Sequence, residues 1–326
     1  MSKAAQSSPV RLAFPAFCLL PVVSAVLMAQ PGLFDYPASG LLHDAVSRTI
    51  RPILGVPGSA YLGSPVLSDV ESAAIAPGGR WVFAGLRDNT ALLHSRANRV
   101  LAEEPIDGIL EHIERIAWSP DGLAAVVHSP SRGAIQRISF RDDRALAGRP
   151  LEDVSLGGRT TALAVESTSG KIAAGFDRGL YLFTGDGPPI PLALETRVQT
   201  AVFSPDGSML AAIDSSTGQV QVFRGLPPVI ETISFSSEPS QPQGVAFSAD
   251  SGRLIVPDAA CACLWIYELA ARRVVDQIAL DAPPTCLEPL NGSSVYLLRR
   301  SQPVMVLQLS PVPAVFLVPA QEPEGL

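Results

Sequence analysis

Polar side chains that could bind or convert a small ligand recur at one place in the sequence, six residues ahead of a repeated turn. The carboxylate and amide members of this set are Glu71, Glu114, Gln199 and Gln243, and the arginines beside this set are Arg115, Arg159 and Arg197. Guanidinium groups bind carboxylates and phosphates through paired hydrogen bonds, and carboxylates can act as general bases. The set predicts a site for a small polar ligand or a peptide carboxylate. The competing interpretation is that loop residues are polar in most proteins.

No known catalytic motif accompanies these residues. The sequence contains no GxSxG, P-loop, GxGxxG or HExxH pattern. The four histidines have no cysteine or histidine neighbour at metal-ligand spacing. We therefore expect no metal site and no cofactor. Glu71 and Glu114 are the only acidic pair at equivalent positions, which gives an enzyme hypothesis little support.

The cysteines offer a second kind of chemistry. Cys261 and Cys263 flank one alanine, and Cys286 follows at the start of the next repeat. In an oxidising compartment Cys286 could form a disulfide with Cys261 or with Cys263. A packed, unpaired Cys286 is an equal alternative.

These residues are carried by a unit that recurs six times along the chain. Each copy has an apolar strand, a turn rich in Pro, Asp and Gly, and a second apolar strand; the copies span 72–85, 114–127, 161–175, 200–213, 244–256 and 285–298. Their turn glycines are 37 to 48 residues apart, and further strands follow each copy. This spacing predicts an all-β fold, a β-propeller of four-stranded antiparallel blades.

The number of blades depends on the chain ends. Residues 40–55 parallel 263–280 as a third and fourth strand. We expect seven blades, the seventh built from these N-terminal strands and residues 314–318, because a closed ring leaves no exposed strand edge. Six blades with an added N-terminal hairpin are the alternative.

The inner strands have one large and one small face. Trp118 and Phe203 stand next to Ala117 and Val202, for example, and strand side chains alternate between faces. The large face of one blade is therefore expected to pack on the small face of the next. The turn aspartates are expected to cap the turns, with glycine taking a positive φ.

Three of the turns resemble those of the bacterial propeller families called WD40-like, PD40 (the TolB type) and YVTN. The resemblance is carried by residues 119–122 (SPDG), 204–207 (SPDG) and 248–250 (SAD) and covers about residues 70 to 310. It implies the fold and assigns no functional residue. The eukaryotic WD signature is absent, because Ile266 and not an aspartate follows Trp265.

The N-terminal residues 1–29 have the features of a secretory signal peptide. Lys3 and Arg11 precede an uncharged apolar run, 12–29, that ends in small residues. An uncleaved membrane anchor is the alternative, although Pro15 and Pro21 disfavour a long helix. Residues 30–326 would then form a single exported propeller domain, periplasmic or extracellular, with no stable membrane span.

The mature chain would be acidic, with 22 basic and 31 acidic side chains and a net charge of −9. This charge disfavours a nucleic-acid partner. We expect a monomer that acts as a non-enzymatic scaffold for an envelope or secreted protein or peptide. The alternative is a lactonase-like or other hydrolase with its site at the mouth of the channel.

Overall fold

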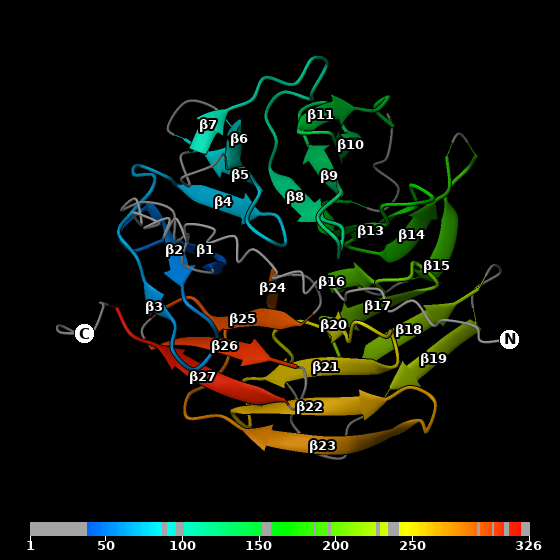
Figure 1. The fold of residues 1–326 in the computed structure, drawn as a ribbon. Coiled ribbons are helices and arrows are strands. Elements are labelled where there is room, and N and C mark those ends of the chain that lie inside the picture. Colours follow the sequence, from blue (N-terminus) through cyan, green and yellow to red (C-terminus); the bar gives the residue numbers. More distant parts are fainter. Residues whose placement is uncertain are drawn as a thin grey trace, which may run out of the picture. The chain divides into compact units, whose positions relative to one another are not determined.

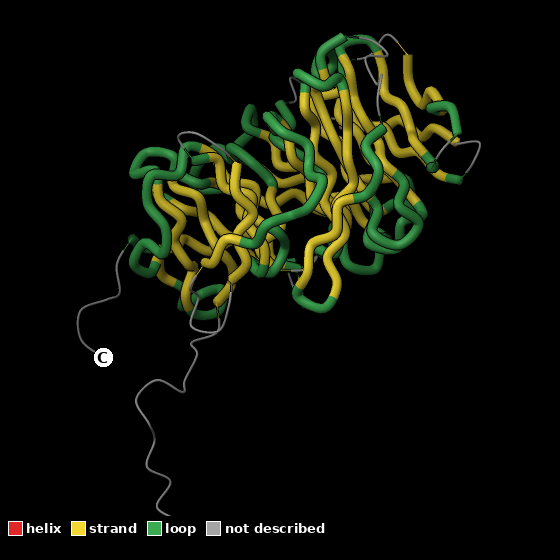
Figure 2. Tube along the Cα trace, turned by 90° about the horizontal axis from the view of Figure 1, so that it is seen from above, coloured by secondary structure: helices red, strands yellow, loops and turns green. Residues whose placement is uncertain are grey.

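The chain is represented by a computed structural model that describes residues 38–86, 90–95, 101–151, 158–185, 187–194, 197–225, 229–233, 241–291, 294–301, 303–309 and 313–320. Every regular element in these ranges is a β-strand, with loops at both ends of the strands (Figure 2). Within the same ranges, no helix has the length and apolar character needed to span a bilayer. The predicted signal peptide, residues 1–29, lies outside the described residues.

The strands form seven antiparallel sheets that follow one another along the chain as blades around a centre (Figure 1). The first blade contains β1 (Ala38–Asp44), β2 (Thr49–Leu54) and β3 (Tyr61–Leu62). The next three contain β4 (Ser72–Ile75), β5 (Trp81–Gly85), β6 (Thr90–Ser95) and β7 (Leu101–Glu103); β8 (Arg115–Trp118), β9 (Ala124–Ser129), β10 (Ala134–Arg141) and β11 (Arg144–Ala147); and β12 (Thr160–Val165), β13 (Ile172–Phe176), β14 (Gly179–Phe183) and β15 (Ile190–Leu194). The last three contain β16 (Val198–Phe203), β17 (Met209–Asp214), β18 (Val220–Arg224) and β19 (Val229–Ile233); β20 (Ala246–Phe247), β21 (Arg253–Asp258), β22 (Cys263–Glu268) and β23 (Arg273–Ala279); and β24 (Glu288–Asn291), β25 (Val295–Arg299), β26 (Val304–Gln308) and β27 (Ala314–Val318).

The predicted seven-bladed β-propeller is confirmed. Seven clusters of buried apolar side chains lie among the described residues, and each joins two neighbouring blades. Ile50 of the first blade packs in one cluster with Val82 of the second, and Ile53 packs in another with Leu297 of the last. Burying one such side chain stabilises the fold by roughly 1.5–3 kcal/mol. Because the first blade packs on both neighbours, the six-bladed alternative is wrong.

The asymmetry of the inner strands is also confirmed. Trp118 packs in the cluster between the second and third blades, whereas Ala117 faces the cluster between the third and fourth. Phe203 and Val202 divide in the same way between the clusters on either side of the fifth blade. Large residues thus face the preceding blade and small residues the following one.

The first blade differs from its prediction. β1 ends at Asp44, as second strands β17 and β21 end at Asp214 and Asp258, and the turn after β1 lies beside the start of β4, where Arg48 pairs with Glu71 at 3.0 Å. β1, β2 and β3 are therefore second, third and fourth strands, and no described residue fills the inner position of this blade. Residues 40–55 were predicted to form a third and a fourth strand on the assumption that every blade has an inner strand.

Two neighbouring blades close the ring across that inner position. The backbone N–H of Gly78, in the turn after β4, donates to the carbonyl oxygen of Leu290 in β24 at 2.8 Å. Residues 314–318 do not enter the first blade as expected, because β27 pairs with β26 and completes the last blade. The chain beyond β27 reaches β3 through one bond, from Leu62 N–H to the Pro319 carbonyl at 3.0 Å.

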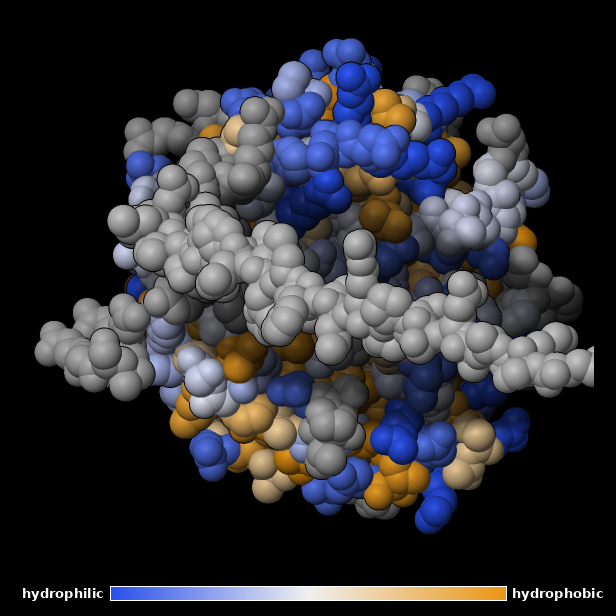
Figure 3. Space-filling model, in the orientation of Figure 1, coloured by the Kyte–Doolittle hydropathy of each residue, from blue (hydrophilic) through white to orange (hydrophobic). Residues whose placement is uncertain are grey.

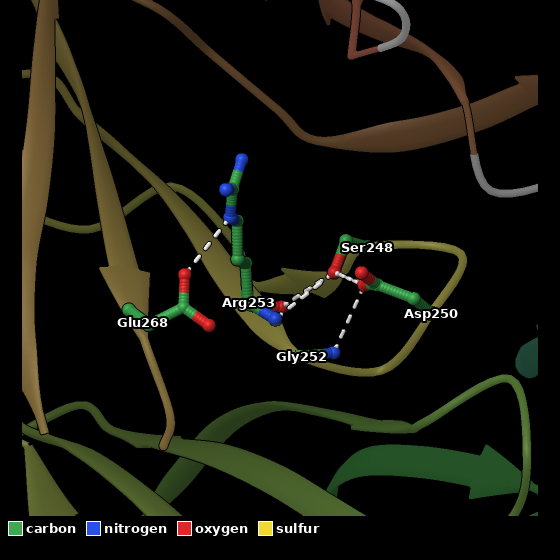
Figure 4. Close-up of polar contacts among 5 residues, drawn as sticks. All are labelled: Ser248, Asp250, Gly252, Arg253 and Glu268. Carbon is green, nitrogen blue, oxygen red and sulfur yellow. Dashed lines mark hydrogen bonds and ion pairs between the residues drawn. The ribbon is translucent and has the colours of Figure 1, made fainter. Parts of the chain in front are cut away.

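The six inner strands β4, β8, β12, β16, β20 and β24 begin at one face of the ring, here called the site face, and end at the other, the turn face. On the turn face, Ser248 Oγ donates to Asp250 Oδ1 at 2.5 Å, and the same oxygen accepts from Gly252 N–H at 3.0 Å. Arg253 N–H donates to Ser248 Oγ at 2.9 Å, and its Nε lies 3.1 Å from Glu268 (Figure 4). Aspartate capping of this turn is thereby confirmed.

The two SPDG turns have the same bonds. Ser119 Oγ donates to Asp121 Oδ1 at 2.6 Å and Ser204 Oγ donates to Asp206 Oδ1 at 2.5 Å. Gly122 and Gly207 have φ values of 71° and 69°, as the sequence predicts. These turn residues therefore stabilise the hairpins between the first and second strands of their blades.

Apolar residues also reach the outer surface of the blades. Over the lower blades in the space-filling view, hydrophobic and hydrophilic residues are intermingled, while hydrophilic residues predominate over the upper ones (Figure 3). Val275 on β23 and Leu317 on β27 are 40% and 51% exposed. Single exposed apolar residues of this kind are ordinary and mark no site.

Candidate functional site

A cavity of about 660 Å³ opens where four consecutive inner strands begin. β4, β8, β12 and β16 supply most of its wall, and Arg300, after β25 of the last blade, completes it. The polar and charged side chains of the lining are Ser72, Thr90, Glu114, Arg115, Thr161, Gln199, Thr200 and Arg300. The inner strands thus place polar residues from several blades around one space.

A second cavity, of about 280 Å³, adjoins the first. Both are lined by Ala73, Ala74, Ile116 and Arg300, and the second is bounded by β1, β4 and β24. It lies at the inner position that no described strand of the first blade fills. Among the described residues, the channel is therefore wider on the side where Arg300 lies.

Three of the predicted site residues, Glu114, Arg115 and Gln199, line the larger cavity together. Arg115 is half-buried, its Nε is buried without a hydrogen-bond partner, and no ion pair of its guanidinium is found within the described ranges. A desolvated guanidinium without a counter-ion is a strong attractor for an anion. Gln199 Nε2 also donates to the Pro242 carbonyl at 3.4 Å, which leaves its amide oxygen for a ligand.

The other four predicted residues lie outside the lining of this cavity. Glu71 is paired with Arg48 on the site face. Arg159 and Arg197 are brought together by Asp177: the Arg159 N–H donates to it at 3.0 Å and Arg197 Nε lies 3.6 Å away.

The remaining residue, Gln243, donates through Nε2 to the Gln241 carbonyl at 3.0 Å. Equal sequence distance from the turn therefore did not give equal distance from the channel. Strand length does not account for this, since β4 and β8 both have four residues, and Glu71 instead pairs with Arg48 of the first blade.

An ion pair between Glu288 and Arg300 was not predicted from the sequence. Arg300 Nε donates to Glu288 Oε2 at 3.2 Å, and Nη2 bonds the other carboxylate oxygen. Burial acts to lower the pKa of Arg300, but the Glu288 carboxylate outweighs it and the pKa is raised. Arg300 therefore stays charged, and its free N–H groups can bind a ligand. The available signal was Glu288 itself, an acid at the position where three other copies have serine.

His128 of β9 stands directly behind Arg115, because the two residues are paired across β8 and β9. Its Nε2 lies 3.2 Å from Thr160 Oγ1, and its Nδ1 makes no hydrogen bond within the described part of the chain. Burial lowers the pKa of His128; Glu114 acts to raise it and Arg115 to lower it. The ring is therefore neutral at pH 7.

Thr161 is a further polar group of the cavity wall. The side chain is nine-tenths buried, and its hydroxyl has no partner among the described residues. An unpartnered buried hydroxyl is costly unless a ligand or water bonds it. Thr161 and Arg115 thus both present uncommitted polar atoms to the same space.

The disulfide differs from both predicted pairings. Cys261 bonds Cys263 across one residue, and Cys286 is a free thiol. Cys286 packs between the last and first blades, whereas Cys263 is buried between the fifth and sixth, so different interfaces separate them. Burial raises the pKa of Cys286 to about 12, which makes it an inert, packed thiol.

Metal-ligating side chains do not gather in the described ranges: no three of His, Cys, Asp and Glu lie close enough there to hold an ion. The charged groups of the larger cavity are instead one carboxylate, that of Glu114, and two guanidinium groups, those of Arg115 and Arg300.

No protein-family model matches the sequence, and no curated protein does. Among solved structures, the chain is similar to Kuenenia stuttgartiensis hydrazine synthase, with 13% identity, a TM-score of 0.60, and 83% of this chain and 92% of that one covered. It is also similar to a putative 6-phosphogluconolactonase from Bacteroides fragilis, with 12% identity, a TM-score of 0.61, and 89% and 98% of the two chains covered. At these identities the likeness shows the shared fold, and the chain is a β-propeller like its neighbours.

Proposed function

We propose that the protein is a lactonase-like hydrolase that opens a small polar lactone in the channel cavity. The observation that carries the proposal is the uncommitted guanidinium of Arg115 in a cavity that also holds Glu114. The sequence analysis favoured a non-enzymatic binding scaffold. The likeness to the putative 6-phosphogluconolactonase counts against that prediction and favours its lactonase alternative, so we correct it.

The reaction needs a base, a group that stabilises negative charge and donors that orient the substrate. Glu114 is the base: it takes a proton from a water that attacks the lactone carbonyl carbon. Arg115 stabilises the negative charge that develops on the carbonyl oxygen, because it stands charged and partly desolvated before the substrate arrives. The ring C–O bond then breaks, and the leaving alkoxide takes a proton to give the open hydroxy acid.

Substrate recognition is assigned to the other groups of the lining. Gln199 and Thr161 offer an amide and a hydroxyl to the hydroxyl groups of a sugar-derived ring. Arg300, fixed by Glu288, is placed to bind an acidic substituent such as a phosphate or carboxylate. His128 is a positioning residue, since its neutral ring lies behind Arg115 on the neighbouring strand.

The test is hydrolysis of six-carbon sugar lactones, with and without a phosphate, followed by acid release at constant pH. Arg115→Ala is expected to lower kcat/KM by at least about a hundredfold, the usual loss of an oxyanion-stabilising donor. Arg197→Ala is the matched control, since that arginine pairs with Asp177 outside the cavity lining. Equal losses in both variants, or none in Arg115→Ala, would count against the site.

Export and repeat family remain parts of the proposal. The apolar run of 12–29 supports cleavage before Gln30 and a periplasmic or extracellular location. The SPDG turns support the PD40 or YVTN type of repeat. The mass of the protein secreted by its host would test the first point: a chain that begins at Gln30 supports it, and an intact Met1 contradicts it.

A further inference from the structure

The turn between β21 and β22 has an alanine where the turns before β10 and β18 have glycine. Residues 259–262 form this turn, and Ala262, its last residue, has a φ of 48°. Gly133 and Gly218, which hold the same place before β10 and β18, have φ values of 59° and 71°. An alanine thus takes a left-handed conformation that glycine adopts without strain.

The disulfide encloses this residue. Cys261 and Cys263 lie on either side of Ala262 and are bonded to each other. Cys261 is exposed on the turn, whereas Cys263 is the first residue of β22 and is 2% exposed. Only one of the two sulfur atoms is therefore open to attack from solution.

The buried sulfur has a hydrogen-bond donor of its own. Gln277 on β23 donates through Nε2 to Cys263 Sγ at 3.4 Å. A donor to sulfur stabilises the thiolate over the thiol, and a stabilised thiolate leaves more readily in exchange. The two sulfurs thus differ in both access and charge stabilisation.

Hydrogen bonds hold the turn independently of the disulfide. The buried Asp258 carboxylate accepts hydrogen bonds from the Gln241 and Ala260 N–H groups, at 2.8 and 2.9 Å. The Leu280 N–H also donates to the Ala262 carbonyl at 2.8 Å. The blade can therefore keep its fold while the S–S bond opens.

We propose that the Cys261–Cys263 pair is a thiol–disulfide exchange site, with Cys261 as the attacked sulfur and Cys263 as the leaving thiolate. A solution thiolate attacks Cys261 Sγ, the S–S bond breaks, and Cys263 leaves as a thiolate that takes up a proton. A second thiolate then attacks the incoming sulfur and releases Cys261. Two external thiols are oxidised to a disulfide, and the pair gains two electrons and two protons.

The test uses the folded full-length chain in glutathione buffers poised near about −200 mV, in the range typical of exchange-active pairs. Free thiols are trapped with iodoacetamide, and peptide masses separate the pair from Cys18 and Cys286. The expected result is a pair distributed between open and closed forms, with Cys286 unlabelled. A pair that stays closed in excess reduced glutathione, yet opens with dithiothreitol after denaturation, would overturn the proposal.

Two variants test the assigned roles. Gln277→Leu is expected to slow opening several-fold, while Gln219→Leu, at the equivalent turn of the fifth blade, leaves the rate unchanged. Ala262→Gly is expected to leave the equilibrium unchanged, because the turn holds its last residue in the left-handed region without a disulfide, as at Gly133 and Gly218. An unchanged rate in Gln277→Leu would overturn the assignment of Cys263 as the leaving group, and a shifted equilibrium in Ala262→Gly would overturn the independence of the turn from the disulfide.

Discussion

The aspartate-capped turns and the cavity wall, on opposite faces of the propeller, use polar residues in opposite ways. On the turn face, Asp206 and Asp250 accept hydrogen bonds from a neighbouring serine hydroxyl and from backbone N–H groups of their own turns. On the site face, Arg115 Nε and Thr161 Oγ1 have no partner among the described residues, although both are buried. Satisfied polar groups stabilise a fold, and unsatisfied ones cost stability unless a ligand bonds them. Ser251 Oγ and Arg137 Nε on the turn face are also unpartnered, so the contrast is between the aspartate-capped turns and the cavity wall and does not extend to the whole of each face.

The largest expected effect is a loss of activity with little loss of stability. Glu114→Gln should lower kcat by at least about a hundredfold, because an amide cannot take the proton from water. Glu114 is exposed on the site face, so the melting temperature should change little. Glu71→Gln is the control, since Glu71 pairs with Arg48 outside the cavity lining. A large fall in melting temperature for Glu114→Gln would show that the two faces share the structural role.

On the turn face, we expect a substitution to lower stability and to leave activity unchanged. Gly207 has a φ of 69°, and a Cβ there would lie 2.7 Å from Cγ of Glu166 in the preceding blade. Gly207→Ala should therefore destabilise the protein by about 2 kcal/mol, from the left-handed penalty plus the close approach. Specific activity of the folded fraction should be unchanged. Gly187→Ala, where a Cβ would meet nothing within 4 Å, is the control in chemical denaturation.

The turn-face carboxylates should also make stability depend on pH. Burial acts to raise the pKa of Asp206, but hydrogen bonds from Ser204 and Ser208 outweigh it and the pKa is lowered. A lowered folded-state pKa contributes stability that is present above the unfolded value of about 3.9 and is lost as the pH falls through the folded one.

The Asp206→Asn variant tests this dependence. It should be less stable than the natural protein by about 1 kcal/mol at pH 7, as expected for one lost charge-assisted hydrogen bond. The gap should shrink below about pH 4, where the aspartate is protonated first in the unfolded chain and, at lower pH, in the folded protein as well. Denaturation curves at pH 7 and pH 3 measure this difference in the free energy of unfolding between the variant and the natural protein. A gap that is constant with pH would mean that the charge of Asp206 makes no contribution.

The sequence predicts the fold well because packing is periodic. Trp118 beside Ala117 already indicates which face of a blade meets which neighbour, and the structure confirms it. The first blade was harder to predict, since Asp44 marks the end of a second strand only when it is compared with Asp214 and Asp258 in the folded turns. Local repeats fix the strands, but closure of the ring depends on contacts between chain segments far apart, such as Gly78 with Leu290.

The site was predicted in part for the same reason. Glu114, Arg115 and Gln199 lie at or beside the starts of inner strands of similar direction and line one cavity, whereas Glu71 and Gln243, at the same spacing as Glu114, bond other partners. Arg300 follows a second strand and reaches the cavity because the first blade lacks a described inner strand. No spacing within the repeat indicates that position. The single signal was the replacement of the usual turn serine by Glu288, its ion-pair partner.

The smallest expected effect tests which residue of the fifth copy takes the place of the turn glycine. The sequence aligns Gly252 with Gly122 and Gly207, but the positive φ of the fifth copy falls on Ser251, at 58°. The Ser251 N–H bonds the Ser248 carbonyl at 2.9 Å, as the Gly122 and Gly207 N–H groups bond the first serine of their turns.

Ser251→Gly should therefore stabilise the protein by about 0.5 kcal/mol, because glycine adopts this φ without strain. The Ser251 hydroxyl is buried without a hydrogen-bond partner among the described residues, so its loss does not oppose the gain. Gly252→Ala, whose Cβ would meet only the Asp250 carboxylate at 3.4 to 3.5 Å, should change stability less than Gly207→Ala does. If Ser251→Gly were destabilising while Gly207→Ala cost about 2 kcal/mol, the Ser251 side chain would contribute more than its backbone conformation costs, and the turn face would hold the ring through side chains more than through backbone conformation.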